Sequence, residues 1–445
     1  MRMVTISTPT ASPGPGTEPG PQPVNGKLET KLCRLSLAPS CGVPAPCGQP
    51  CQLALGPERH ALLELGGLAR LVIIAQPGRR GTFCQQAGDL FAQLACILGN
   101  QPTPFVPTTL MVFLRRSADE TLCRDLVAEW FGAAPPVTTY VTQPPCDGAA
   151  LGVELWAMGG PGAKVTRLGP HLLTTEADGI RWIYVGDVRG EPAATSAYTE
   201  AWSGFDQMQR QLTRAGAGFG QVVRSWLYVN HITAGESGRQ RYQELNRART
   251  DFYGDIRFGR KAITEAPENY PASTGIGTTG SAMVMACMAL DSQRPDVFLL
   301  PLENPQQTPA YDYQASYSPQ SPKFSRAMAV VQGHFVTTLV SGTASILEAK
   351  TVFPGDVVRQ TRQTLENIER LIASENFARH GLSGAGATLR DLAKLRVYVK
   401  RPADYERCRA EVERRLPRVP AIYLQADICR SDLLVEIEAV AFSPR

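Results

Sequence analysis

The stretch Val419 to Val440, VPAIYLQADICRSDLLVEIEAV, decides how this chain is interpreted, because its aliphatic second half carries two acids, Glu436 and Glu438. Side chains two residues apart on a strand lie on the same face. Both carboxylates should therefore leave one side of the strand, toward a cleft or toward water. Cys429 precedes Glu436 by the odd interval of seven residues, so only a turn at 430–432 can return both to one side. The alternative interpretation is an edge strand with a solvated glutamate face.

The last third of the chain, from Val330 to Arg445, predicts a strand, a helix, a strand, a helix and the closing strands. Its first strand, HFVTTLVSGTASI, ends near Gly342, and Gln360 enters the helix after a break at 354–356. This βαβαβ order resembles the YjgF/RidA family. The resemblance implies units that pack as trimers, with ligands in the clefts between neighbouring subunits.

The same plan occurs twice more upstream, which indicates an internal repeat. One copy runs from Arg70 to Ala157, and the next runs from GIRWIYVGDVRG to YPASTGIGTTGSAMVMACMAL. We therefore expect an α+β fold of three fused YjgF/RidA-like (chorismate-mutase-like) units that form an internal pseudo-trimer, with mixed sheets inside and helices outside. Only the third copy carries both Cys429 and Glu436. The first keeps Glu154 alone, and the second has alanine and methionine in place of the acid.

Length and composition agree with a multi-unit protein. At 445 residues the chain is long enough for about three domains. We expect a disordered Pro/Gly-rich leader at 1–55, a first unit at 56–160, a second at 161–300, an aromatic substrate-site connector at 301–329, and a third unit with the catalytic residues at 330–445.

Charge and hydropathy exclude several classes of partner. A net charge of +4 without Lys/Arg clusters argues against nucleic acid. No run approaches the roughly 18 apolar residues of a membrane span, and no signal peptide is recognisable. We expect a cytoplasmic protein without membrane association. The eleven cysteines and five scattered histidines do not match zinc spacings, and no phosphate-binding loop is present, so we expect no metal and no organic cofactor.

The connector carries aromatic and basic side chains between its prolines: ENPQQTPAYDYQASYSPQSPKFSRA, residues 303–327. Its prolines prevent a regular strand. Tyr311, Tyr313, Tyr317 and Arg326 together favour a site for a small cyclic carboxylate, because a guanidinium binds a carboxylate through two hydrogen bonds while phenols donate to ring oxygens. The alternative is a packed connector with Arg326 at the surface.

Several motifs together make the last 270 or so residues resemble the chorismatases, the chorismate-hydrolysing branch of the YjgF-like fold. They are PASTGIG, the ENPxQ…YxY…Y…P…FSRA segment, SGTASI followed by GD, RVYVKRP and DICRSDLLVEIE. The resemblance implies acid-initiated loss of the enolpyruvyl group of chorismate as pyruvate.

The same resemblance assigns the site residues. Glu436 is the expected acid, with a pKa that burial must raise. Arg326 and Arg249 would anchor the two carboxylates of chorismate, and Tyr313, Tyr317 and Gln307 would line the ring side. Glu438 is expected to be either solvated or a supporting hydrogen-bond partner.

Two positions predict the product. At the positions of Gly342 and Cys429 the chain resembles the hydroxybenzoate-forming branch, which has glycine and cysteine there. Members that form a dihydroxycyclohexadiene carboxylate tend to have alanine at both positions. Gln307 also resembles the hydroxybenzoate-forming branch. Gly342 would leave room for the ring to tilt, and Cys429 would steer the C4 hydroxyl toward internal displacement. The expected product is 3-hydroxybenzoate, with 4-hydroxybenzoate open as a co-product. The double variant Gly342→Ala/Cys429→Ala is then expected to shift the product toward the dihydroxy acid.

Three alternatives remain at this point. One is chorismate hydrolysis to the dihydroxycyclohexadiene carboxylate. Another is a RidA-like imine deaminase, although Ala421 stands where that family has its carboxylate-binding arginine. The third is a non-catalytic YjgF-like binding protein. Since three units already complete a pseudo-trimer, we expect a monomer or a weak dimer, and a stable homotrimer would contradict the internal-trimer interpretation.

Overall fold

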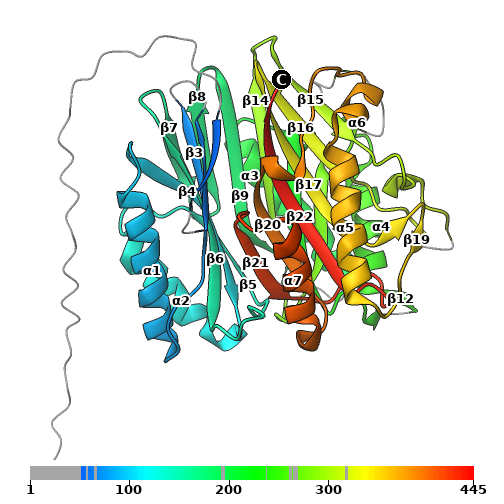
Figure 1. Cartoon of the computed structure of the whole chain (residues 1–445), viewed down its shortest axis with the longest axis horizontal. Coiled ribbons are helices and arrows are strands. Elements are labelled where there is room, and N and C mark those ends of the chain that lie inside the picture. Colours follow the sequence, from blue (N-terminus) through cyan, green and yellow to red (C-terminus); the bar gives the residue numbers. More distant parts are fainter. Residues whose placement is uncertain are drawn as a thin grey trace, which may run out of the picture. The chain divides into compact units, whose positions relative to one another are not determined.

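The computed structural model describes residues 52–56, 59–64, 68–191, 196–236, 238–259, 263, 269–315 and 319–445. All described residues lie in one compact part of the chain, Pro46–Arg445. This part is mixed α+β, as the sequence predicted, with helices packed against large sheets (Figure 1). The predicted leader falls outside the described residues up to residue 51, but its last residues belong to a strand, Gln52–Gly56.

Three six-stranded sheets follow one another along the chain, and all three have the same strand order. The first sheet has the order β1 (Gln52–Gly56), β2 (His60–Glu64), β3 (Ala69–Ala75), β6 (Leu151–Gly159), β4 (Phe105–Leu114) and β5 (Val137–Val141). The second has the order β7 (Lys164–Gly169), β8 (Leu172–Ala177), β9 (Ile180–Arg189), β14 (Val284–Ser292), β10 (Val222–Asn230) and β13 (Ala272–Thr278). The third has the order β15 (Val297–Leu302), β16 (Ala327–Gln332), β17 (Phe335–Ala344), β22 (Val435–Pro444), β20 (Leu392–Val399) and β21 (Ala421–Gln425).

The pairing of strands is also the same in the three sheets. The final pair, β4 with β5, β10 with β13 and β20 with β21, is parallel, and a helix connects its strands. The remaining pairs are antiparallel. Two short hairpins lie outside these sheets: β11 (Gly235–Glu236) with β12 (Arg239–Gln240), and β18 (Ile346–Leu347) with β19 (Lys350–Thr351).

Each sheet packs two long helices on one face. They are α1 (Phe83–Gly99) and α2 (Glu120–Phe131) on the first, α3 (Ala197–Arg214) and α4 (Arg241–Tyr253) on the second, and α5 (Val357–Ile372) and α7 (Tyr405–Arg415) on the third, where the short α6 (Ser374–Arg379) follows α5. The helices are amphipathic: in α5 the buried Val357, Leu365, Ile368 and Ile372 recur at helical spacing and pack on the sheet.

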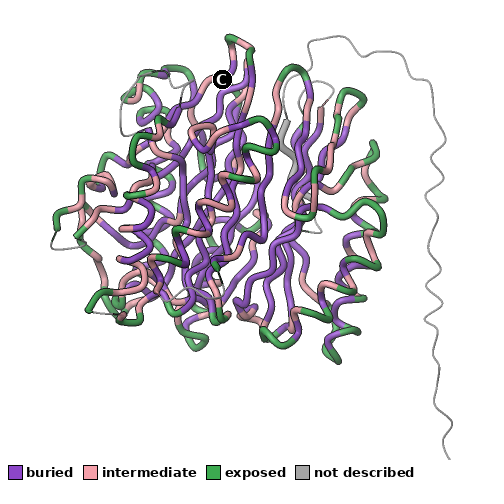
Figure 2. Tube along the Cα trace, turned by 180° about the vertical axis from the view of Figure 1, so that it is seen from behind, coloured by how far each residue is buried: buried purple, intermediate pink, exposed green. Residues whose placement is uncertain are grey.

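The opposite faces of the three sheets pack against one another. One hydrophobic cluster joins Val72, Trp182 and Leu339, and another joins Phe113, Ile276 and Tyr398, so each contains residues from all three sheets. Figure 2 shows the buried strands inside and the exposed residues on helices and loops. Clefts between neighbouring sheets are therefore places where distant parts of the sequence meet.

A β-bulge at the same place in each sheet aligns the three units. The register shifts between Pro107 and Thr109 against β6, between Val222 and Arg224 against β14, and between Leu392 and Lys394 against β22. Bulges redirect the side chains that follow them. Residues at equal distances from these bulges therefore occupy equivalent positions.

The predicted elements of the repeats are present, but each sheet has additional antiparallel strands that the sequence analysis did not predict. The second sheet includes β7 and β8, and the third begins with β15 at Val297, before the predicted connector at 301–329. Between β15 and β16 the described residues contain a short 3-10 helix at Ala310–Asp312 and no strand, as the prolines predicted. No helix in the described ranges is long and apolar enough to cross a membrane.

Candidate active site

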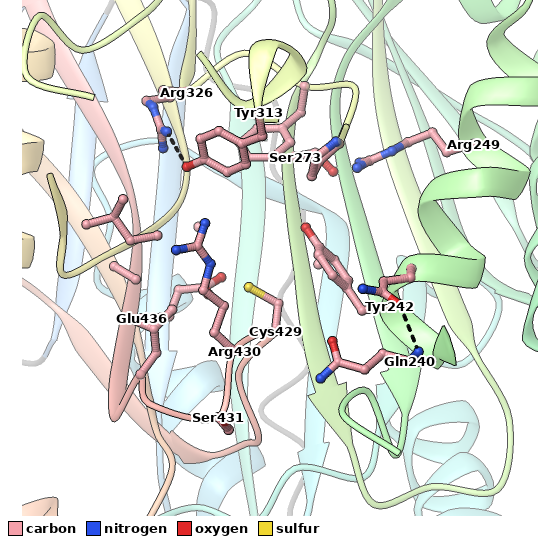
Figure 3. Close-up of a pocket in the computed structure, with 18 residues that line it drawn as sticks. Gln240, Tyr242, Arg249, Ser273, Tyr313, Arg326, Cys429, Arg430, Ser431 and Glu436 are labelled. Atoms are coloured by element: carbon pink, nitrogen blue, oxygen red, sulfur yellow. Dashed lines mark hydrogen bonds between the residues drawn. The ribbon is translucent and has the colours of Figure 1, made fainter. Parts of the chain in front are cut away.

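A cavity of about 280 Å³ lies between the second and third sheets. The second unit supplies Tyr242 and Arg249 from α4, and the third supplies Gly342 from β17 and Glu436 from β22. Figure 3 shows Glu436 on one side of this space, and Tyr242 and Arg249 of α4 on the other. The volume suits a small metabolite rather than a large cofactor.

The turn between β21 and β22 brings Cys429 to the same cavity as Glu436. The backbone N–H of Gly277, in β13, donates to the carbonyl of Asp427 at 2.8 Å, and this contact ties the turn to the second sheet. The Asp427 carboxylate in turn accepts from Lys400 at 2.8 Å and from Thr233. The expected return of Cys429 and Glu436 to one side is therefore confirmed.

Glu436 has the properties of a carboxylic acid that keeps its proton at neutral pH. It is 5% exposed, and no hydrogen bond or ion pair reaches its carboxyl group from the described residues. Burial raises the pKa of Glu436 to about 8, and the neighbouring Glu438 contributes to this rise. Because β22 lies between β17 and β20, the alternative of an edge strand with solvated glutamates is wrong.

Glu438 shares a face with Glu436 but lies in a buried ion cluster. Its carboxylate accepts from Arg224 at 2.9 Å, from Lys394 at 3.1 Å and from the Thr274 hydroxyl at 2.7 Å. Burial alone would raise the pKa of Glu438, but Arg396, Lys394 and Arg224 more than offset this and hold it well below its usual range. Glu438 is therefore a supporting partner, and the solvated alternative is wrong.

Glu154, the single acid of the first unit, belongs to the same cluster. It accepts from Arg396 at 2.6 Å and from Lys394 at 3.2 Å. Burial opposes its ionisation, but these two cations hold the pKa of Glu154 at about 2. Its role is to neutralise cations of the third unit.

The strand register explains why, among the described residues, an acid like Glu436 occurs in only one of the clefts between neighbouring units. Glu436 pairs with Tyr398, two residues beyond the ion-cluster position on β20. The equivalent pairs are Gly152 with Phe113 in the first sheet and Val284 with Tyr228 in the second. Neither glycine nor valine can donate a proton, so only the cleft between the second and third units has a titratable group at this position.

The variant Glu438→Gln is expected to lose about 3 to 5 kcal/mol of unfolding free energy, because it leaves Arg224, Lys394 and Arg396 buried with one carboxylate fewer. Urea unfolding at neutral pH measures this loss. The matched control is Glu366→Gln, which removes an exposed carboxylate from α5 and should change stability little. Equal stability of the two variants would contradict the assignment of Glu438 to the ion cluster.

Gly342 is required by the approach of Glu436. A methyl group on Gly342 would overlap Oε1 of Glu436 and would lie 3.0 Å from its carboxyl carbon. The Gly342 N–H donates to the Thr274 hydroxyl at 3.0 Å, at a bulge where β17 shifts its register against β22. The sequence interpretation gave this glycine the role of making room for the ring. In the structure the carboxyl group of Glu436 takes up that room.

Cys429 is a neutral thiol at this site. Burial raises its pKa to about 12, and the nearby Glu436 contributes. A nucleophilic cysteine needs a thiolate, so Cys429 can donate a weak hydrogen bond but is not suited to covalent catalysis. The steering role expected for Cys429 stays a prediction.

Arg249 presents an uncompensated positive charge at the cavity wall. It is 1% exposed, its Nη2 donates to Oδ1 of Asn246 at 2.5 Å, and its Nε has no partner. No described carboxylate lies within ion-pair distance of it. A buried guanidinium of this kind is a ready partner for a substrate carboxylate.

Arg326 is held in place by the connector. Its Nη2 donates to the Thr308 carbonyl at 2.8 Å and to the Tyr313 hydroxyl at 2.9 Å. Its Nε lies 3.6 Å from Oε2 of Glu303 without a hydrogen bond. Burial raises the pKa of Glu303 to about 7, against the opposing effect of Arg326. The Nε–H of Arg326, which has no hydrogen-bond partner, is therefore available to a ligand.

Two predicted residues are not placed at the cavity. Gln307 lies behind the wall rather than in it, contrary to the prediction, because its amide nitrogen donates to the carbonyl of Ile346 at 2.8 Å. Tyr317 lies outside the described residues. Among the lining residues that were not predicted are Arg430, Tyr242 and Ser273.

Arg430 is the most consequential of these additions. Its guanidinium lies 5.4 Å from the ring of Tyr313, and its Nη1 donates to the carbonyl of Ala349 at 2.8 Å. It directly follows Cys429 in the DICRSD motif, so its place in that motif was the available signal. The cavity therefore has three arginines, which suits a ligand with more than one carboxylate.

Known proteins with similar sequences and structures show the family of this chain. The family model described as chorismatase FkbO/Hyg5-like, N-terminal, matches residues 156–289. A 3-hydroxybenzoate synthase of Streptomyces hygroscopicus is 36% identical over 277 residues, which cover 60% of this chain and 77% of that protein. A chorismatase of the same organism is 34% identical over 248 residues, covering 55% and 67% respectively. A crystal structure of a chorismatase has a TM-score of 0.60 at 25% identity and covers 85% of this chain and 100% of that one.

These relatives and the acid-bearing cleft give one identification. The chain belongs to the chorismatase family of enzymes.

Proposed function

We propose that this protein removes the enolpyruvyl group of chorismate as pyruvate and converts the ring to 3-hydroxybenzoate. The observation that carries the proposal is the carboxyl group of Glu436, which is buried, protonated at neutral pH and placed at a cavity with three arginines. An enol ether is cleaved when its methylene carbon gains a proton. The similarity to a 3-hydroxybenzoate synthase supports the product.

Glu436 acts as the general acid. Its proton goes to the methylene carbon, which becomes the methyl group of pyruvate, and the C3–O bond of the ring then breaks. The ionised Glu436 left after this step lies near Arg224, which favours its charge. A group with a pKa near the working pH can both give up and regain a proton efficiently.

Arg249 and Arg326 hold the two carboxylates of chorismate. They lie on opposite sides of the cavity, one from α4 and one from the connector (Figure 3). Tyr313, fixed by Arg326, supports the ring side. In this proposal the enol ether of chorismate faces Glu436.

Cys429 directs the outcome at the ring. The oxygen of the C4 hydroxyl bonds to C3 as the C3–O bond to pyruvate breaks, and it releases its proton, so that one oxygen bridges C3 and C4. The C4–O bond then breaks as this oxygen regains a proton, and loss of the C3 hydrogen gives the aromatic ring with its hydroxyl at C3. No water is consumed, so pyruvate and 3-hydroxybenzoate together contain all the atoms of chorismate. A neutral thiol beside the C4 hydroxyl favours this path over attack by water.

The experiment that tests the proposed function is incubation of the purified protein with chorismate. Coupled lactate dehydrogenase measures pyruvate, and chromatography identifies the ring product. Equimolar pyruvate and 3-hydroxybenzoate support the proposal. Formation of the dihydroxycyclohexadiene carboxylate would indicate the hydrolytic branch. Absence of pyruvate would contradict the proposal and favour an imine deaminase or a non-catalytic binding protein.

The variant Arg326→Ala is expected to raise KM for chorismate by roughly tenfold to a hundredfold, because a hydrogen bond to a charged group contributes about 1.5 to 3 kcal/mol. The kcat should fall less, since the acid is untouched. Steady-state pyruvate release measures both constants. The control Arg379→Ala removes an exposed arginine of α6, and an unchanged KM in Arg326→Ala would exclude this residue as an anchor.

We also propose that the three units form an internal pseudo-trimer of YjgF/RidA-like units. The identical strand orders support this arrangement. So do the contacts of β5 with β9, of β13 with β17 and of β20 with β2 and β3, because they link the sheets in a cycle. Light scattering should then give the mass of a monomer or a weak dimer, and a stable homotrimer would contradict the proposal.

A further inference from the structure

A second cavity lies where the three sheets meet, and the proposed reaction does not use it. Its volume is about 60 Å³, and its lining includes Trp156, Trp182, Tyr184 and Phe442 from all three sheets. Glu154, Lys394 and Arg396 of the ion cluster line it too. Phe442 and Glu436 lie on the same face of β22, since they are separated by an even number of residues, so one strand face borders both cavities.

Arg70 on β3 lines this cavity as a buried cation without a counter-ion. It is 8% exposed, and no described residue donates, accepts or forms an ion pair with its guanidinium. The guanidinium lies over the ring of Trp182, whose centroid is 4.7 Å from Cζ. A cation–π contact contributes about 2 kcal/mol when desolvated. Burying a charge costs several kcal/mol, and arginine cannot release its proton in a protein.

Other groups around the cavity also favour negative charge. The indole N–H of Trp182 and the hydroxyl of Thr337 are buried and have no partner. The neighbouring ion cluster holds the cations Arg224, Lys394 and Arg396 against the two carboxylates of Glu154 and Glu438. The described interior around this cavity therefore has more positive than negative charge, even before Arg70 is counted.

We propose that this central cavity binds one small monovalent anion, of the size of a halide or a one- or two-carbon carboxylate, with Arg70 as its main ligand. A water molecule occupies about 30 Å³ of liquid, so about 60 Å³ admits a small anion but not an aromatic acid. The substrate of the proposed reaction is therefore too large for this site.

Arg70 and Trp182 also line a second hollow, of about 70 Å³. Asp178, the carboxylate at that hollow, is paired with Arg294 and does not compensate Arg70. Because strands of all three sheets surround the anion, its binding should stabilise the folded chain.

Bromide provides the direct test, because its anomalous X-ray scattering identifies it in a crystal. Crystals of the full chain soaked in sodium bromide should show an anomalous peak within about 3.5 Å of the Arg70 guanidinium. Crystals of Arg70→Met should not show it. Absence of the peak in the unchanged protein would overturn the proposal, and this measurement does not depend on the folding of any variant.

Thermal unfolding in solution tests the energetic consequence. At constant ionic strength, replacing sodium gluconate by sodium chloride should raise Tm of the unchanged protein saturably, by a shift on the order of 2 °C. Arg70→Met should lose this shift and, in gluconate, should be at least as stable as the unchanged protein, because an uncompensated charge is gone. Arg79→Met, which removes an arginine whose side chain is 85% exposed, should keep the shift. The same chloride dependence in Arg70→Met would overturn the proposal.

Discussion

Replacing Glu436 by glutamine should reduce pyruvate release from chorismate by at least about a hundredfold, the scale on which a general acid contributes. Glutamine keeps the shape of the side chain but has no proton to give to the methylene carbon. The variant should fold normally. In the folded protein the pKa of Glu436 is raised to about 8, which is above its value in the unfolded chain. As the pH rises between these two values, the unfolded chain loses this proton while the folded protein keeps it, so the free energy of unfolding falls. Glutamine removes this cost.

The measurement compares kcat and the melting temperature of Glu436→Gln with those of Glu366→Gln, which alters an exposed carboxylate of the same unit. Glu366→Gln should retain full activity. A folded Glu436→Gln variant with near-normal turnover would remove Glu436 from the mechanism.

Gly342→Ala should have the second largest effect, a loss of pyruvate release on the order of a hundredfold. The added methyl group would overlap Oε1 of Glu436, so the carboxyl group must move away from the substrate. Misplacement of a catalytic group by about 1 Å can cost this much in rate. A coupled pyruvate assay, with circular dichroism to check folding, measures the effect.

Cys429→Ala is the matched comparison, because it leaves the acid where it is. It should retain pyruvate release while its ring product shifts from 3-hydroxybenzoate toward the dihydroxy acid. The double variant Gly342→Ala/Cys429→Ala was expected from the sequence to shift the product. It should also release pyruvate more slowly, because it contains the Gly342→Ala change. Cys408→Ala, a buried cysteine on α7, controls for the loss of a thiol. Full activity in Gly342→Ala would show that the acid does not depend on this glycine.

The acids of β22 show what a local pattern can predict. Alternation along a strand placed Glu436 and Glu438 on one face, and the structure agrees. The pattern could not distinguish their fates, because the cations beside Glu438 include Arg224, which is 214 residues away in sequence. One acid stays neutral and the other ionised owing to contacts between units, which no local spacing encodes.

The cavity residues show the same limit. The proximity of Cys429 and Glu436 could be predicted from the sequence, because a single turn separates them. Tyr242 and Ser273 could not, since they reach the cavity only through the packing of the second sheet on the third. Gln307 was misplaced because its motif indicated the neighbourhood of the site, whereas its side-chain amide bonds the backbone behind the wall.

The internal repeat could be recognised in the sequence, because the same order of strands and helices recurs in each unit. The additional strands β7 and β8 were missed because KVTRLGPHLLTTEA mixes polar and apolar residues without clean alternation. The strand β8 lies within the second sheet, between β7 and β9, and its Thr174 and Thr175 are buried. Tertiary packing, rather than local preference, stabilises these strands.

The pH dependence of pyruvate release tests the central claim, that a protonated Glu436 starts the reaction. A general acid must carry its proton, and the pKa of Glu436 is raised to about 8. The account predicts that kcat/KM for chorismate is highest below this pH and falls with the loss of one proton as the pH rises through about 8. A rate that stays flat or increases through that range would contradict it.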